Sequence, residues 1–146
     1  MQIKFVRLSP NAEPPTRGTP GAAGLDLCAC LSEPVVIEPG KAETIPLGFA
    51  AEIPSGYGGF VLSRSGIGSR GIVVAQGVGL IDSDYRGEWC VPLRNLGEEP
   101  HTVSPGDRVA QVVFMRAEAG EFIEVESMWE LSKTSRGERG FGSTGN

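Results

Sequence analysis

Short runs of apolar residues, several of them alternating with polar ones, recur along the chain between turn residues. Such runs, rich in Val, Ile, Phe and Thr, are typical of β-strands. In Phe122–Glu126, Ile123 and Val125 alternate with glutamates, so the two kinds of side chain would face opposite sides of a sheet. The clearest runs are Ile3–Leu8, Val35–Glu38, Thr44–Ile53, Phe60–Ser63, Gly71–Ala75, Glu88–Asn95, Asp107–Arg116 and Phe122–Glu126.

Glycine and proline separate these runs and leave little room for helices. The chain of 146 residues contains 21 glycines and 11 prolines, and both residue types end or weaken helices. The pattern predicts a single all-β domain, a sandwich or a barrel. Residues 121–136 form the longest stretch without Gly or Pro, where a helix could compete, and Ser63–Ser69 could hold a short turn.

The two ends of the chain differ from the middle. Residues 10–21 form a loop rich in Pro and Gly, and residues 136–146 form a polar, Gly-rich tail with one aromatic residue, Phe141. We therefore expect a β domain over residues 1–135 and a mobile arm over 136–146. The composition of the arm favours disorder, and the alternative is an arm that closes over a ligand.

Charge and cysteine content exclude several function classes. The net charge of −5 argues against sequence-independent nucleic-acid binding, which needs a broad basic face, but a few arginines can still hold one small anion. Cys28-x-Cys30 lacks zinc-ligand spacing, Cys90 stands alone, and His101 is the only histidine, so we expect reduced thiols rather than a zinc site. With no apolar run of membrane-spanning length and no signal-peptide pattern, we expect a cytoplasmic protein without membrane contact.

Three Gly-rich segments contain residues that could bind an anion or take part in catalysis. In Ser63–Gly71, glycines let backbone amides approach an anion while serines and arginines add donors; a solvated turn between strands is the alternative. In Gly79–Glu88, Asp82 ends an apolar run and could act as a general base or metal ligand, although an Asp-rich turn explains the pattern equally well. Arg136–Gly145 is similar to a phosphate-cradling loop but lacks the Walker pattern.

Taken together, these segments resemble the trimeric dUTPase family from end to end. The two most specific are Gly79–Glu88 and the tail, and five matching motifs follow one another in the family's order. They are Ala23–Leu27, Arg64–Gly66, Gly79–Glu88, Gly106–Gln111 and Arg136–Gly145. The resemblance implies a distorted jelly-roll-like β-barrel or sandwich with a flexible C-terminal arm. It implies a homotrimer with active sites shared between subunits. It also implies hydrolysis of dUTP to dUMP and pyrophosphate, which limits uracil incorporation into DNA and supplies dUMP for dTMP synthesis.

The resemblance also implies a role for each matching residue. Asp82 would deprotonate the water that attacks the α-phosphorus, and Asp26 would contact a triphosphate-bound Mg²⁺ through water. Tyr85 would pack under the deoxyribose and exclude a 2′-hydroxyl. The Val74–Leu80 hairpin, including Gly79, would read uracil. The expected phosphate and base contacts are Arg64, Ser65, Gly66, Gln111, Arg136, Phe141, Gly142, Ser143 and Thr144.

Two positions depart from the family pattern. Gln76 stands where many members have asparagine, six residues before Asp82, so its uracil-reading role is carried over as a weaker expectation. Glu138-Arg139 follows Arg-Gly where a small residue is common, and Arg139 could contact phosphate or face water. The rival functions on this scaffold are a dCTP deaminase, which would need a glutamate near Pro92, and a non-catalytic regulatory protein.

Overall fold

A computed structural model describes residues 1–140 and shows an almost purely β chain. One α-helical turn, α1 (Ser65–Gly68), and one 3₁₀ turn, η1 (Met128–Glu130), are the helical elements of this part. The strands are β1 (Lys4–Arg7), β2 (Leu25–Cys28), β3 (Val35–Ile37), β4 (Ala42–Pro46), β5 (Phe49–Glu52), β6 (Tyr57–Leu62), β7 (Ile72–Val74), β8 (Gly79–Ile81), β9 (Cys90–Asn95), β10 (His101–Val103) and β11 (Arg108–Arg116).

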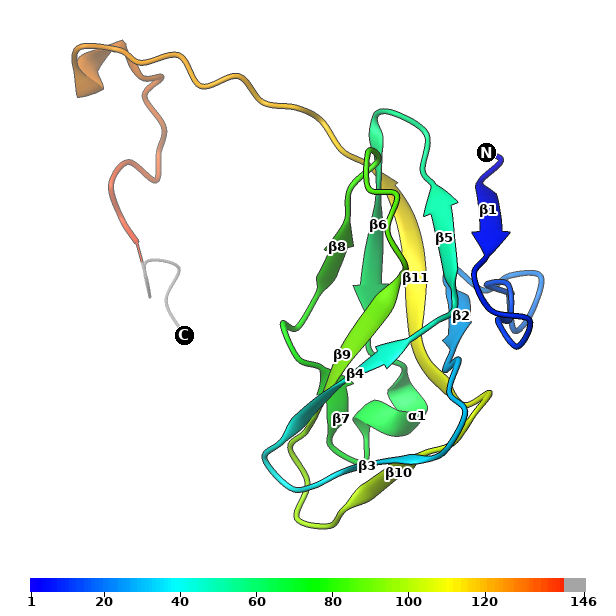
Figure 1. Ribbon diagram of the computed structural model, residues 1–146. Coiled ribbons are helices and arrows are strands. Elements are labelled where there is room, and N and C mark those ends of the chain that lie inside the picture. The colour runs from blue at the N-terminus through cyan, green and yellow to red at the C-terminus, as the bar shows by residue number, and fades with distance from the viewer. Residues whose placement is uncertain (141–146) are drawn as a thin grey trace.

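The strands form antiparallel sheets that enclose one core (Figure 1). A four-stranded sheet has the order β2-β11-β6-β8, and a three-stranded sheet has the order β4-β9-β7. The pairs β1-β5 and β10-β3 complete the described part, which forms no closed barrel. This arrangement confirms the predicted all-β, jelly-roll-like class. Within the described residues, no helix is long and apolar enough to cross a membrane.

Aromatic side chains fill the centre of the core. Trp89 and Phe49 are almost fully buried, with ring centroids 5.3 Å apart, and Phe114 packs 6.4 Å from Trp89. Burial of such large apolar side chains dominates the stability of a small β domain. The three cysteines are free, and burial together with the nearby Glu13 raises the pKa of the Cys28 thiol to about 11.

The sequence pattern predicted most strand positions but not all of them. The run Thr44–Ile53 is divided into β4 and β5 by Gly48, whose φ of +71° suits glycine. Strands β2, β8 and β10 were missed because three or four residues carry little periodicity.

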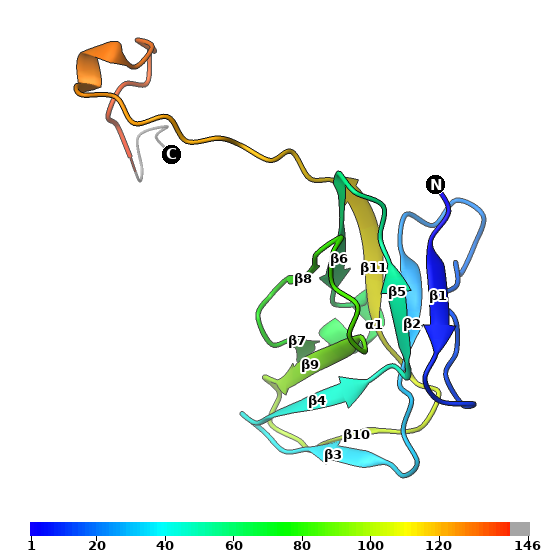
Figure 2. The same ribbon diagram turned by 45° about the horizontal axis from the view of Figure 1, so that its top comes forward.

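The predicted strand at Phe122–Glu126 is wrong. Residues 117–127 form no strand, because beyond β11 the chain leaves the sheets and has no neighbouring strand to pair with (Figures 1 and 2). Within residues 121–136, the helical content is limited to η1, where Ser127 and Glu130 form a capping box.

Asn95 is the buried polar residue that connects three segments near the end of β9. Its amide nitrogen donates to the carbonyl oxygens of Ile37 at 2.9 Å and Glu99 at 2.7 Å, and its amide oxygen accepts from the Gly97 backbone N–H at 2.8 Å. The bond to Ile37 is buried and the other two are partly buried, so the Asn95 side chain satisfies backbone groups that water reaches poorly.

We expect Asn95→Ala to lower the thermal midpoint of unfolding, since it leaves these backbone groups unpaired. The cost of burying unsatisfied groups is about 1–3 kcal/mol. Differential scanning calorimetry measures it, with Asn11→Ala at an exposed position as the matched control. If both variants melt with the wild type, Asn95 does not stabilise the fold in this way.

Candidate functional site

A carboxylate on β2, an arginine on β11 and an arginine between β6 and α1 form the centre of the candidate site. Arg64 Nε lies 2.7 Å from Asp26 Oδ1, and Arg108 Nη1 lies 3.3 Å from Asp26 Oδ2. The sheet brings them together, because Asp26 pairs with Gln111 on β11 and Gln111 pairs with Leu62 at the end of β6. The Asp26 side chain is only 14% exposed, so the ion pair with Arg64 is shielded from solvent more than a surface pair.

A cavity of about 260 Å³ opens beside this cluster. Gln111 is fixed at its edge, since its side-chain nitrogen donates to the Ser63 carbonyl at 3.1 Å. Gly24 makes room for it, because a Cβ there would lie 2.8 Å from the Gln111 amide oxygen. The lining residues are Gly18, Thr19, Ala22, Gly24, Asp26, Arg64, Ser65, Arg108 and Gln111.

The structure thus gathers Asp26, Arg64, Ser65 and Gln111 around one cavity, as the motif positions predicted. Gly66 lies in α1 with open space where a side chain would be, which leaves the turn accessible to a ligand. Sequence reasoning missed Arg108 as a site residue, although it belongs to the motif Gly106–Gln111. Only the pairing of β2 with β11 shows that its guanidinium lies beside Asp26.

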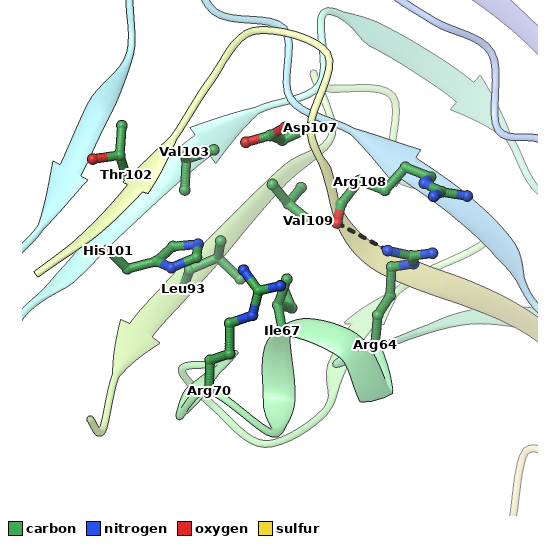
Figure 3. Close-up of a pocket in the computed structure, with 10 residues that line it drawn as sticks. All are labelled: Arg64, Ile67, Arg70, Leu93, His101, Thr102, Val103, Asp107, Arg108 and Val109. Carbon is green, nitrogen blue, oxygen red and sulfur yellow. Dashed lines mark hydrogen bonds between the residues drawn. The ribbon is translucent and has the colours of Figure 1, made fainter. Parts of the chain in front are cut away.

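A second cavity of about 260 Å³ adjoins Arg64 and Arg108 (Figure 3). Arg70, which follows α1, and His101, which opens β10, point toward one another across it. Arg64 Nη1 donates to the Arg108 carbonyl at 3.3 Å at its border. Three arginines therefore gather around α1 in a chain of net charge −5, and this local positive charge suits a polyanion.

Asp82 lies on a different part of the fold. It follows β8, is exposed, and its carbonyl accepts from the Tyr85 backbone N–H at 3.2 Å. Gln76 is exposed in the connection between β7 and β8, and Gly79 packs against Val61, where a Cβ would approach within 3.2 Å. The hairpin expected at Val74–Leu80 is wrong, because β7 pairs with β9 and β8 pairs with β6, so this segment connects two different sheets. Gln76 in the connection, and Asp82 and Tyr85 after β8, are all exposed.

A single chain does not bring Asp82 to the arginine cluster. Strands β8 and β6 are antiparallel, so Ile81 lies opposite Gly59, whereas Arg64 follows the far end of β6. Gly59 and Arg64 are five residues apart, which is roughly 15 Å of extended chain at the usual strand rise. A base must lie within hydrogen-bond reach of the water that attacks phosphorus. Within this chain, Asp82 therefore lies apart from the arginine cluster.

The tail residues predicted to bind phosphate fall in two groups. Arg136 and Arg139 are exposed, and each Nε donates to the other's carbonyl at 3.0 Å, away from the cavity beside Asp26. Phe141, Gly142, Ser143 and Thr144 lie outside the described residues. Residues 1–140 also contain no cluster of three or more His, Cys, Asp or Glu side chains that could hold a metal ion without help from a ligand.

Comparisons with known proteins show the family of the chain. A family model described as dUTPase matches residues 10–145. A deoxyuridine 5'-triphosphate nucleotidohydrolase of Desulfitobacterium hafniense is 48% identical over 99% of this chain and 95% of the relative. One of Chlamydia trachomatis is 45% identical over 97% of each chain.

Solved structures show the same likeness in three dimensions. A Staphylococcus bacteriophage 80alpha dUTPase mutant, solved with dUpNHpp, superposes with a TM-score of 0.84 at 30% identity over 99% of each chain. A mutant dUTPase from phage phi11 of S. aureus, described for its structural Mg(II) ion, has a TM-score of 0.77 at 27% identity, covering 88% of this chain and 99% of its own.

Proposed function

The chain belongs to the dUTPase family, and on this premise we propose that it hydrolyses dUTP to dUMP and pyrophosphate. The observation that carries the proposal is the cavity at Asp26, where Arg64, Ser65 and Gln111 converge although they are far apart in the sequence. The reaction would limit uracil incorporation into DNA and supply dUMP for dTMP synthesis. We place it in the cytoplasm, which the free thiols support.

In the proposed mechanism, Asp82 accepts a proton from a water molecule that attacks the α-phosphorus in line. Phosphoryl chemistry depends mainly on positioning and charge neutralisation, so most of the site should consist of donors. Arg64, Ser65, Gly66 and Gln111 supply these donors along the phosphate chain, and Arg136, Ser143 and Thr144 bind its γ end. Guanidinium groups suit phosphate because their paired N–H groups match its oxygens.

Mg²⁺ is the cofactor that we propose, and when bound it neutralises charge on the triphosphate. The donor set fits an ion held largely by substrate, since Mg²⁺ keeps several waters and often takes one or two carboxylates besides phosphate oxygens. Asp26 is the carboxylate that lines the cavity, and it would contact the ion through water. Its pairing with Arg64 and Arg108 keeps it in place at the wall.

The connection between β7 and β8, together with the turn after β8, would bind the nucleoside. Backbone groups near Gly79 and the side chain of Gln76 would read uracil, and Phe141 would stack on the base. Tyr85 would form a floor under the deoxyribose that leaves no room for a 2′-hydroxyl. The exposure of Gln76 and Tyr85 supports this assignment, because a surface that contacts substrate must be free in the unliganded chain.

Pyrophosphate release from dUTP, UTP, dTTP and dCTP, with and without Mg²⁺, tests the proposed function. We expect rapid release from dUTP alone among these nucleotides, and only with Mg²⁺. Ammonia release from dCTP would instead indicate a deaminase, and binding of dUTP without turnover would indicate a regulatory protein. Either result would contradict the proposal.

We further propose a homotrimer whose active sites are shared between subunits. The separation of Asp82 from Arg64 along β6 supports this assembly, because a neighbouring chain can supply the missing half. The segment after β11 supports it too, since Phe122 is 101% exposed and Trp129 is 82% exposed in the single chain. Large apolar side chains left in water are typical of an interaction surface.

Sedimentation equilibrium should therefore give three times the mass of one chain. Trp129→Ser should weaken the assembly and raise the protein concentration at which activity is lost, because it removes an apolar contact. Arg116→Ser, exposed at the end of β11, is the matched control and should leave both unchanged. An active monomer would overturn the shared-site proposal.

A further inference from the structure

Tyr85 is held to its own turn by two hydrogen bonds, one from its side chain and one from its backbone. Its hydroxyl donates to the Glu88 carbonyl at 3.0 Å, and its backbone N–H donates to the Asp82 carbonyl at 3.2 Å. Tyr85 is nevertheless 44% exposed. The ring is thus held in one orientation in the unliganded chain while part of it stays free to contact a ligand.

Gly87 leaves the space in which this ring lies. A Cβ at Gly87 would overlap the Tyr85 hydroxyl and would lie 2.6 Å from Cζ and 3.0 Å from Cε2. Non-bonded carbon atoms prefer separations of about 3.5–4.0 Å. Gly87 is not among the glycines with positive φ, so its backbone conformation is open to any residue. Glycine is required here for space alone.

Glu88 anchors the acceptor of the Tyr85 hydroxyl to the rest of the fold. Its carboxylate Oε1 accepts from the Gly48 backbone N–H at 2.9 Å, in the connection between β4 and β5. The next residue, Trp89, donates its N–H to Phe49 at 2.9 Å and accepts from the Leu47 N–H at 3.0 Å. The Glu88 carbonyl is therefore fixed by the buried core.

We propose that Gly87 and Glu88 set the sugar selectivity of the enzyme by fixing the height and tilt of the Tyr85 ring. This inference rests on the proposed function, in which that ring lies under the deoxyribose. Gly87 is a specificity-determining residue, because any side chain there displaces the ring and removes the close floor that excludes a 2′-hydroxyl. Glu88 is a positioning residue, since it holds the carbonyl that orients the ring.

The test compares kcat/KM for dUTP and UTP in the full-length assembled enzyme. Gly87→Ala should lower the dUTP-to-UTP ratio by about tenfold or more, the scale on which misfit of one small group changes discrimination. Glu88→Ala should lower the ratio less, whereas Glu88→Gln should preserve it, because the amide oxygen still accepts from Gly48. Gly120→Ala, at an exposed position with open space, is the matched control.

A double-mutant cycle separates this role from a general structural one. In a Tyr85→Ala background there is no ring to displace, so Gly87→Ala should cause no further fall in the ratio. If Gly87→Ala does not fold, Tyr85→Phe and Glu88→Ala still test the hydroxyl contact, and each should lower the ratio.

An unchanged ratio in Gly87→Ala, or an equal further fall without the ring, would overturn the inference while leaving dUTP hydrolysis intact. A wild type that does not release pyrophosphate from dUTP would overturn the proposed function as well.

Discussion

Asp82→Asn is expected to lower kcat for dUTP by about 10²–10⁴-fold, the usual contribution of a general base. Asparagine has nearly the same shape as aspartate but cannot accept the proton of the attacking water. The side chain is exposed at the end of β8, and the turn is held by the Asp82 carbonyl rather than by the carboxylate. The variant should therefore fold, assemble and bind dUTP as the wild type does.

Steady-state pyrophosphate release and equilibrium binding of a non-hydrolysable analogue measure the two effects separately. Asp84→Asn is the matched control, since Asp84 is an exposed carboxylate in the same turn. It should retain most of the turnover. Near-normal kcat in Asp82→Asn would remove Asp82 from the mechanism, and loss of analogue binding would show that its role is in binding rather than proton transfer.

A chain that ends at Ser135 is expected to lose turnover by about 10²-fold or more, because correct positioning of substrate groups contributes at least that much. The truncation removes Arg136, Phe141, Ser143 and Thr144, the proposed contacts to the γ-phosphate and the base. Ordering a Gly-rich segment costs about 1–2 kcal/mol of backbone entropy per residue, so we expect closure only when a ligand supplies these contacts.

The same truncation should leave the fold intact, since the last strand ends at Arg116 and the core lies before it. Removal of Asn146 alone is the control and should change nothing. We also expect Phe141→Trp to report closure through a fluorescence change when the analogue binds. If the truncated enzyme works at close to the full rate, residues 136–146 do not close over the site.

The residue pattern predicted the all-β class because β-strands of sufficient length show a local alternation of apolar and polar residues. Runs such as Asp107–Arg116 are long enough to show their period, and β11 coincides with that run. The strand expected at Phe122–Glu126 did not form because a strand needs a partner, which a local pattern cannot reveal. The boundary at residue 135 and the mobility of the arm stay predictions.

The family motifs predicted which side chains would gather at the candidate site, but not how the sheet arranges them. Asp26, Arg64 and Gln111 were expected together, and strand pairing places them around one cavity. The contribution of Arg108 depends on sheet register, and the spaces beside Gly24 and Gly87 depend on neighbours that are not apparent from the sequence.

Mixed assemblies test the central claim, a dUTP-hydrolysing site built from two chains, most directly. Asp82→Asn and Arg64→Gln subunits, each nearly inactive alone, would be co-refolded in equal amounts and assayed for pyrophosphate release from dUTP. If Asp82 and Arg64 of one site come from different subunits, random mixing in a symmetric trimer restores both groups in about a quarter of the sites. We therefore expect about a quarter of wild-type turnover. Mixed assemblies no more active than the two separate variants would contradict the account.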